Sequence, residues 1–266
     1  MIKRCHMEKL KLLSLNIGNP SLERAIKQCT WLVSRPEDIF VLTETKNSRG
    51  CHYIENFFSN YGNDLLTIDS AQKYYVNFPC STTGDLGVMI ISKYPFQREQ
   101  HIFDSTNRYF SRQVEVFVDT FSIMGLYVPS RDRSDDKIER KFNFLSDIKH
   151  NLSESNRKKS IILGDFNILE KNHIPHYSTF FDWEYKFYDF LTENEYVDAF
   201  KKCNPLKQDY SWVGRTGDGY RYDYCFVSND ISHYIQDCKF IHETREKKLT
   251  DHSAIILNIL LNNDNL

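Results

Sequence analysis

The chain has 266 residues, of which 41% are hydrophobic and 26% are charged, and its formal net charge is -2. These values are ordinary for a globular protein and argue against a disordered chain. They also exclude a large overall basic excess, so positive charge that meets a nucleic acid must be local or come from a metal ion. The length suits one large domain or two small ones and allows a sizeable core.

Seven cysteines are scattered along the chain without a CxxC pair, which fits neither a zinc ribbon nor a disulfide framework. The odd number favours free thiols in the cytoplasm. No apolar run reaches the length of a transmembrane helix, and the run over residues 10–17 is interrupted by polar residues, as in a strand and unlike a signal peptide. We therefore expect a cytoplasmic protein without a membrane partner.

The first elements alternate between strand and helix. LKLLSLNIG (residues 10–18) predicts a strand, and SLERAIKQCTWLVSR (21–35) has apolar residues at helical spacing and stops before Pro36. DIFVLTET (38–45) predicts a second strand. This order indicates layered α/β structure.

The later elements continue this pattern. Strands are predicted at LGVMIIS, QVEVFVD, FSIMGLYVPS and SIILGDF, and helices at residues 137–152 and at YKFYDFLTENEY (185–196). YSWVG, YRYDYCFVS, CKFIHET and HSAIILNIL predict late strands. No linker-like stretch divides the chain, so we expect a single domain over residues 1–266 with flexible ends at 1–8 and 262–266.

Polar residues stand where several apolar segments begin or end. They are Asn16, Glu44, Tyr127, the pair Asp165 and Asn167, and the pair Asp251 and His252. A charge at the edge of a core is costly unless it is paired or coordinated, so these positions need an explanation. Turn chemistry is one explanation, because Gly-Asp and Asn favour turns and helix caps. The GDFN segment alone is compatible with either interpretation.

A metal site explains part of this set. Glu44, Asp251 and Asn16 offer hard oxygen ligands, the type that Mg²⁺ or Mn²⁺ prefers. His252, next to Asp251, can act as an acid or base or can donate to a phosphoryl oxygen.

Hydrolytic chemistry explains the remaining residues. Asp165 can orient or deprotonate an attacking water. In extended geometry Asn167, two residues further on, points the same way and faces the same site. The Tyr127 hydroxyl can donate a hydrogen bond to a phosphate.

Taken together, these motifs resemble the endonuclease/exonuclease/phosphatase superfamily, the metal-dependent phosphoesterases that include exonuclease III-type apurinic endonucleases. The matching segments occur in family order between residues 10 and 257: LSLNIG, FVLTETK, GDLGVMIISKYP, LYVPS, ILGDFNI, YSWVG, GYRYDYCFVS and LTDHSAII. Each segment is weak alone, and all of them in order are a strong signal. The resemblance implies one catalytic domain with an α/β fold of four layers, in which two mixed β-sheets pack face to face with helices on the outside.

The resemblance also implies roles for individual residues. Asn16, Glu44 and Asp251 correspond to the metal group, Asp165 with Asn167 to the residue that activates water, His252 to the histidine at the scissile phosphate, Asp223 to the carboxylate that orients it, and Tyr127 to the phosphate-side tyrosine. Two plainer interpretations stay open. His252 alone could be a surface histidine, and Arg221 with Asp223 could be a surface ion pair of little energetic value.

Several positions depart from the pattern of the nuclease members. Gly18 stands where an Asp is common, Thr43 where Gln is common, and Ser130 where Asn is expected; Thr250 replaces a common Ser. These changes leave open whether a second metal ion binds and which residues contact the phosphate. They leave the core set of residues in place.

The expected substrate is nucleic acid, with DNA favoured over RNA. GYRYDYCFVS resembles the Arg-x-Asp-Tyr version of nucleases, so Arg221 and Trp212 become candidate substrate contacts, although Trp212 could equally be a core residue. Ser130, Arg131 and Arg133 form a candidate phosphate-binding loop, although neighbouring aspartates offset its charge.

The expected activity is hydrolysis of phosphodiester bonds by in-line attack of water, with Mg²⁺ or Mn²⁺ as the cofactor. Two other classes stay open because a fold does not decide a function. One is a small-molecule or lipid phosphoesterase of the same fold, and the other is a nucleic-acid-binding module with weak catalysis.

Overall fold

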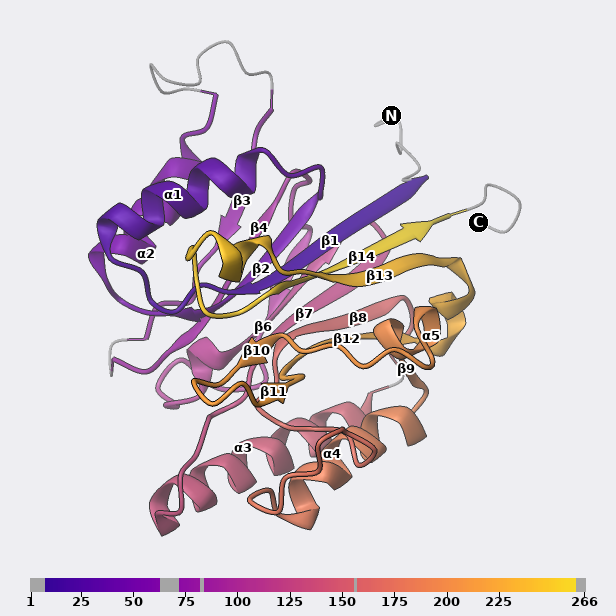
Figure 1. The fold of residues 1–266 in the computed structure, drawn as a ribbon. Coiled ribbons are helices and arrows are strands. Elements are labelled where there is room, and N and C mark those ends of the chain that lie inside the picture. The colour runs from indigo at the N-terminus through magenta and orange to yellow at the C-terminus, as the bar shows by residue number, and fades with distance from the viewer. Residues whose placement is uncertain (1–7, 63–71, 82–83, 156, 262–266) are drawn as a thin grey trace.

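Two six-stranded β-sheets lie face to face, and helices cover their outer faces (Figure 1). Helices α1 (Leu22–Val33) and α2 (Arg49–Ser59) cover the first sheet. Helices α3 (Asp135–Glu154) and α4 (Asp182–Glu193) cover the second. The predicted α/β sandwich of four layers is therefore confirmed.

The computed structural model describes residues 8–62, 72–81, 84–155 and 157–261. Of the ends expected to be flexible, 1–8 and 262–266, all residues except Glu8 lie outside the described residues. None of the described helices is long and apolar enough to cross a membrane.

The first sheet has the strand order β13-β14-β1-β2-β4-β3. Its strands are β1 (Lys9–Asn16), β2 (Ile39–Thr45), β3 (Tyr75–Asn77), β4 (Gly87–Ser92), β13 (Ile235–Ile241) and β14 (Ala254–Leu260). Strands β1 and β2 are parallel and the other neighbours are antiparallel. The carboxyl ends of β1 and β2 therefore lie at the same edge of this sheet.

The second sheet has the strand order β5-β6-β7-β8-β12-β9. Its strands are β5 (Arg98–Gln100), β6 (Gln113–Val118), β7 (Phe121–Tyr127), β8 (Ser160–Asp165), β9 (Tyr196–Asp198) and β12 (Asp223–Ser228). Among the described strands of this second sheet, β7 and β8 form the one parallel pair. A short hairpin of β10 (Trp212–Val213) and β11 (Gly219–Tyr220) stands apart from both sheets.

Short helices connect some of these strands. They are the 3-10 helices Phe110–Arg112 and Asn229–Tyr234 and the helices α5 (Ala199–Cys203) and α6 (Glu243–Glu246).

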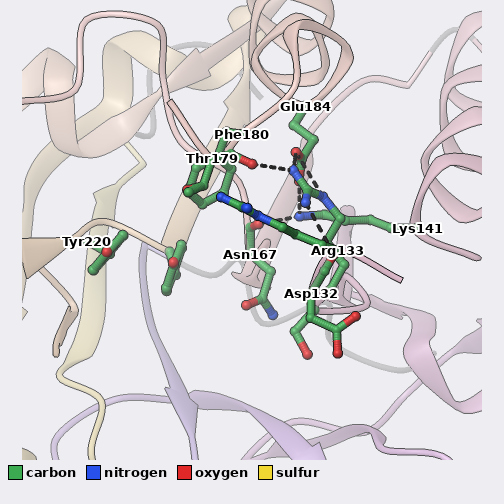
Figure 2. Close-up of a pocket in the computed structure, with 11 residues that line it drawn as sticks. Asp132, Arg133, Lys141, Asn167, Thr179, Phe180, Glu184 and Tyr220 are labelled. Carbon is green, nitrogen blue, oxygen red and sulfur yellow. Dashed lines mark hydrogen bonds and ion pairs between the residues drawn. The ribbon is translucent and has the colours of Figure 1, made fainter. Parts of the chain in front are cut away.

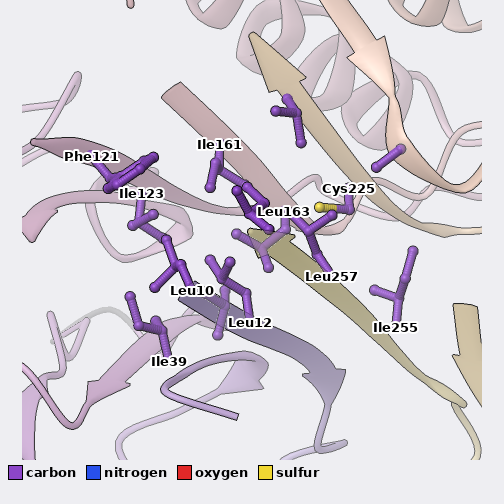
Figure 3. Close-up of a cluster of buried hydrophobic side chains, with 14 of the residues drawn as sticks. Leu10, Leu12, Ile39, Phe121, Ile123, Ile161, Leu163, Cys225, Ile255 and Leu257 are labelled. Atoms are coloured by element: carbon purple, nitrogen blue, oxygen red, sulfur yellow. The ribbon is translucent and has the colours of Figure 1, made fainter. Parts of the chain in front are cut away.

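Three layers of buried apolar side chains hold the four layers together. One lies under α1 and α2, one lies between the sheets, and one lies above α3 and α4. Figure 3 shows the layer between the sheets, where Leu10 and Leu12 of β1 lie opposite Ile161 and Leu163 of β8. Burial of such side chains is the main stabilising contribution to the fold.

Most predicted elements are confirmed with small shifts of their ends. The helix predicted over 185–196 begins three residues earlier at Asp182 and ends at Glu193. Glu195 has a left-handed backbone with φ of 63°, which ends the helix, so Tyr196 starts β9 instead. The predicted strand YSWVG is reduced to the two residues of β10.

Helix α2 was not predicted from the sequence. Gly50 lies in its first turn, and glycine weakens a helix by roughly 1 kcal/mol relative to alanine. The structure explains the glycine, because a Cβ at this position would lie 1.9 Å from the backbone oxygen of Pro20. Close packing of α2 on the loop between β1 and α1 therefore overrides the low helix propensity of Gly50.

Candidate active site at one end of the sandwich

The alternation of side chains between the two faces of β1 places Asn16 in the space between the sheets. In β1, Leu12 belongs to the core between the sheets, and Leu13 belongs to the core under α1 and α2. Because side chains alternate along a strand, Asn16 lies on the same face as Leu12. It is fully buried at the carboxyl end of the strand.

The same alternation places two carboxylates opposite Asn16. Asp165 ends β8 on the face that carries Leu163, and Asp223 begins β12 on the face that carries Cys225. The two aspartates are paired in the register of the antiparallel strands β8 and β12. Both are buried.

Glu44 reaches this end of the sandwich through an irregularity of β2. In a regular strand it would lie on the face of Leu42, which points toward the helices. The register of β2 shifts at this point, and Glu44 has a φ of 56°. Left-handed backbone is uncommon outside glycine and often occurs at functional sites. Glu44 Oε1 accepts a hydrogen bond of 3.2 Å from the buried Tyr127 hydroxyl.

Four side chains from the two sheets form a continuous polar series. Asn16 Nδ2 donates to Asp165 Oδ2 at 2.8 Å and lies 3.4 Å from His252 Nε2. His252 Nδ1 lies 2.7 Å from Asp223 Oδ2. The structure therefore brings together Asn16, Asp165, Asp223 and His252, which are far apart in the sequence.

The charge of His252 is set by its partners. Burial would lower the pKa of His252, but the charge and the hydrogen bond of Asp223, together with Asp165 and Asp251, raise this pKa to about 9. The imidazole is then protonated at neutral pH, and its Nδ1 donates to Asp223. The interpretations of His252 as a surface histidine and of Asp223 as half of a surface ion pair are both wrong, because both side chains are buried.

The carboxyl group of Asp165 is surrounded by negative charge. Burial and the neighbouring carboxylates of Asp223 and Glu44 raise the pKa of Asp165 to about 8, against the lowering effects of His252 and Asn16. A cation near these groups would offset this charge and lower the pKa again.

Glu44 and Asp251 offer carboxylate oxygens, the type of ligand that a divalent cation prefers. Glu44 is half-buried, and Asp251 is exposed and accepts a hydrogen bond of 2.9 Å from Trp212 Nε1. Among the described residues no group of three or more His, Cys, Asp or Glu side chains is arranged to hold a metal ion. Two carboxylates nevertheless suit Mg²⁺, which keeps several waters and uses substrate phosphate as a ligand.

Asn16 has a different orientation from the one expected for a metal ligand. Its Oδ1 accepts a hydrogen bond of 2.9 Å from the backbone N–H of Gly18, and its Nδ2 points to Asp165. The amide therefore presents a donor to the site and holds the Asp165 carboxylate in place.

Asn167 does not face the site in the expected way. It follows the end of β8 with a left-handed φ of 48°, so the extended geometry assumed from the sequence is wrong. Its backbone N–H donates to Asp165 Oδ1 at 3.0 Å, and its side chain donates to the Val128 carbonyl at 3.0 Å. Asn167 thus holds Asp165 through its backbone and turns its side chain to a neighbouring pocket.

The predicted loop of Ser130, Arg131 and Arg133 lines this pocket, which Figure 2 shows beside Asn167. The Ser130 carbonyl accepts a hydrogen bond from Arg140. Arg131 is paired with the buried Glu184 and also donates to the Thr179 carbonyl, whereas Arg133 is exposed. Trp212 is half-buried beside Asp251, so its interpretation as a core residue is wrong.

Arg221 is not available to a substrate. Its side chain is only 1% exposed and forms ion pairs with Glu170 and Asp198. It also lies over the ring of Tyr224 at 4.4 Å. The expected substrate contact of Arg221 is therefore wrong, because the residue is part of the core below the site.

Replacing Arg221 with methionine should lower the free energy of unfolding by about 3–5 kcal/mol, because it leaves buried carboxylates without their cation. Urea denaturation would measure this change. The exposed Arg215 offers a matched control, Arg215→Met, with little expected change. An Arg221→Met protein as stable as the wild type would contradict the structural role.

Ser211 is a site residue that the sequence did not indicate. It is fully buried, and its Oγ accepts hydrogen bonds from the backbone N–H groups of Tyr222 and Asp223 at 3.0 and 3.1 Å. Its carbonyl accepts a hydrogen bond of 2.7 Å from Ser253 N–H. Ser211 thus joins the segment of Asp223 to the segment of His252. Ser211 belongs to the YSWVG motif, but a serine in a short predicted strand gives no indication that it joins two segments of the site.

Comparison with known proteins agrees with this fold. The model of the endonuclease/exonuclease/phosphatase family matches residues 13–252. Among curated proteins, none matches the sequence.

Solved structures with a similar fold come from distant relatives. An AP endonuclease from Archaeoglobus fulgidus is 20% identical with a TM-score of 0.76, over 93% of this chain and 98% of that one. A 3′ phosphatase, NExo from Neisseria, bound to a product DNA hairpin, is 18% identical with a TM-score of 0.77, over 94% and 99%. The 3′-5′ exonuclease NExo from Neisseria meningitidis is 20% identical with a TM-score of 0.77, over 94% and 99%. At these identities the likeness shows the fold alone.

Proposed function

The chain belongs to the endonuclease/exonuclease/phosphatase family, and from this premise we propose that it is a metal-dependent phosphodiesterase that hydrolyses nucleic acid. The observation that carries the proposal is the buried polar series of Asp223, His252, Asn16 and Asp165. It combines a carboxylate, a charged imidazole and an amide, groups that can activate a water and stabilise the charge that develops on a phosphodiester.

In the proposed reaction a water molecule attacks phosphorus in line with the leaving oxygen. Asp165 orients this water and accepts its proton, and its own two oxygens are fixed by Asn16 and Asn167. His252 donates a hydrogen bond from Nε2 to a phosphoryl oxygen as negative charge develops there. Because Asp223 fixes the imidazole in advance, little reorganisation is needed in the transition state.

Glu44 and Asp251 would hold Mg²⁺ or Mn²⁺, with water and a phosphate oxygen as further ligands. When bound, such an ion polarises the phosphate and stabilises the charge of the leaving oxygen. The concentration of carboxylates that raises the pKa of Asp165 supports a cation at this position. The Tyr127 hydroxyl, 3.2 Å from Glu44 Oε1, supports the orientation of that carboxylate.

Nucleic acid is the proposed substrate because aromatic and cationic groups lie beside these residues. Trp212 donates a hydrogen bond to Asp251. The exposed Arg133 lines the pocket next to Asn167. DNA is proposed over RNA because similar structures include an AP endonuclease and a phosphatase bound to a DNA hairpin.

Cleavage of labelled oligonucleotides by the purified protein tests the proposal. The panel holds single-stranded DNA, duplex DNA, duplex DNA with one abasic site, and RNA, each with Mg²⁺ or Mn²⁺ and with EDTA. Metal-dependent cleavage that is lost in Asp165→Asn is expected. Absence of cleavage in every strand would overturn the nuclease proposal, and phosphate release from small phosphoesters would then define the activity.

Replacing Glu44 with glutamine should weaken binding of Mn²⁺ at least tenfold, because even residues that only orient metal ligands are worth roughly 10- to 100-fold in affinity. Isothermal titration calorimetry with Mn²⁺ alone measures this change without an activity assay. Glu99→Gln, an exposed change on β5, is the matched control. Unchanged Mn²⁺ affinity in Glu44→Gln would remove Glu44 from the metal group.

A further inference from the structure

Arg24 is a cation near the proposed metal carboxylates, and the reaction described above does not use it. It lies in the first turn of α1, where the Ser21 side chain accepts a hydrogen bond from the Arg24 backbone N–H. A positive side chain is unfavourable at this end of a helix, because the aligned peptide dipoles already make the N-terminus positive. Helix formation therefore does not explain an arginine at this position.

The missing side chain of Gly18 leaves a small space between Arg24 and Asp251. A Cβ added to Gly18 would lie 3.4 Å from Arg24 Nη2 and 4.0 Å from Asp251 Oδ1. The guanidinium and the carboxylate therefore border the same space. Nuclease members of the family commonly carry an Asp side chain at the position of Gly18, so this chain has a positive group where a negative one is common.

The loop between β1 and α1 fixes the Arg24 side chain. Arg24 Nη2 donates a hydrogen bond to the Gly18 carbonyl. The Gly18 N–H donates to Asn16 Oδ1 at 2.9 Å, and the Asn19 N–H donates to the backbone carbonyl of Glu44 at 2.9 Å. The guanidinium is thus held in position relative to Asn16 and Glu44, two residues of the candidate site.

The positive charge of Arg24 is not neutralised by the protein. Within the part of the chain that the structure describes, its side chain forms no ion pair and no hydrogen bond except the one to the Gly18 carbonyl. Its Nε is buried and has no partner. Because the residue is half-buried, its charge is screened less than that of an exposed side chain. A bound anion would supply the missing partner.

Asp251 does not serve as this partner. Its Oδ2 accepts a hydrogen bond of 2.9 Å from Trp212 Nε1, and its Oδ1 accepts one of 3.4 Å from Thr250 Oγ1. Arg24 bonds to the backbone of Gly18 instead. The two charges face each other across the space over Gly18 without forming an ion pair. Each is therefore available to a ligand of opposite charge, a metal ion at the carboxylate and a phosphate at the guanidinium.

We propose that Arg24 is a substrate-binding residue, which contacts the phosphate at Asp251 and takes the place of a second metal ion there. The inference rests on the proposed function, because it assumes that a phosphate approaches the metal carboxylates. A guanidinium suits this role, because it offers paired N–H groups to phosphate oxygens. A fixed cation beside Asp251 also repels a further metal ion. The site should therefore hold one divalent ion per chain.

Calorimetry with Mn²⁺ alone tests the charge of Arg24 without an activity assay. The wild type should bind one Mn²⁺ per chain. Arg24→Gln removes the repelling charge and should tighten Mn²⁺ binding roughly two- to fivefold, the range for single charges near a protein surface. Arg24→Lys keeps the charge and should bind Mn²⁺ as the wild type does. Two ions bound by the wild type, or equal affinity in Arg24→Gln and the wild type, would overturn the effect on the metal.

The salt dependence of DNA binding tests the phosphate contact. Fluorescence anisotropy of a labelled single-stranded oligonucleotide, with EDTA and in the Asp165→Asn background, reports affinity without metal and without cleavage. Arg24→Gln should reduce the slope of log K against log salt concentration by about 0.7, the value for one phosphate of a single strand. Arg98→Gln, which removes an exposed charge from the edge strand β5, should leave the slope unchanged. Equal slopes in the two variants would contradict the contact.

Thermal unfolding separates the proposed contact from a structural role. If Arg24 only holds the loop through the Gly18 carbonyl, Arg24→Gln should lower the Tm and leave the Mn²⁺ affinity and the salt slope unchanged. That result would overturn the inference. Arg24→Lys supplies a further comparison, because its ammonium group keeps the charge but cannot pair with two phosphate oxygens in parallel. It should weaken binding of the oligonucleotide while its affinity for Mn²⁺ stays unchanged.

The proposed function and this inference can fail separately. Metal-dependent cleavage, with unchanged Mn²⁺ affinity and salt slope in Arg24→Gln, would leave the nuclease proposal in place and remove Arg24 from the site. Changes of both quantities in Arg24→Gln, in a protein that cleaves no nucleic acid, would support the phosphate contact and remove the nuclease proposal.

Discussion

Asp165→Asn should reduce kcat for oligonucleotide cleavage by about 10²- to 10⁴-fold, the typical contribution of a general base. The amide has the shape of the carboxyl group but cannot accept the proton of the attacking water. The backbone N–H of Asn167 still has an oxygen to bind. Single-turnover cleavage with saturating Mg²⁺ measures this effect on the chemical step.

A measurement of the Tm shows whether Asp165→Asn loses activity through its chemistry or through unfolding. Because burial and the charges of Asp223 and Glu44 raise the pKa of Asp165, its ionised form is unfavourable in the folded protein. The neutral asparagine removes this cost but loses the hydrogen bond that Asn16 Nδ2 donates to Asp165 Oδ2, so the Tm should change little. Asp104→Asn, an exposed change, is the matched control for both measurements. A fully active Asp165→Asn protein would exclude Asp165 as the group that activates water.

His252→Gln should reduce kcat by about 10²- to 10³-fold, as expected for loss of one fixed donor to a developing oxyanion. The neutral side chain lacks the positive charge that Asp223 stabilises on the imidazole. KM should change less than kcat, because the contact strengthens as charge develops in the transition state. Initial rates across a range of oligonucleotide concentrations separate the two constants.

The exposed His150 on α3 supplies a control for the histidine change. His150→Gln alters a side chain that is 74% exposed and should leave kcat unchanged. If His252→Gln raised KM and left kcat intact, the imidazole would contribute to substrate binding and not to the chemical step.

Much of the site follows from the sequence because its residues stand at strand ends. Asp165 and His252 lie next to regular apolar strands, so their position at one edge of the sandwich could be predicted from the family order of the motifs. Asp223 was placed beside His252 by resemblance, and the structure brings the two within 2.7 Å. These contacts depend on the register of neighbouring strands. The alternation of core-facing and outward-facing side chains along each strand specifies this register locally.

Other contacts depend on irregular backbone or on distant partners. The predicted orientation of the Asn167 side chain is wrong because a left-handed backbone at this residue ends the extended geometry. No sequence pattern indicates the shift of strand register at Glu44. Arg221 was misassigned because its partners, Glu170 and Asp198, come from segments far along the chain. A buried arginine and a substrate-binding arginine have the same local sequence signal, and only tertiary structure distinguishes them.

The position of β14 has a consequence for biosynthesis. This strand lies between β13 and β1, so the middle of the first sheet joins an early segment of the chain to a late one. Asn16 comes from the early segment and His252 immediately precedes the late strand. A ribosome-bound chain that lacks residues 252–260 can form neither the pairing of β1 with β14 nor the contact between Asn16 and His252. A hydrolase with this topology therefore stays inactive until nearly all of the described residues have left the ribosome.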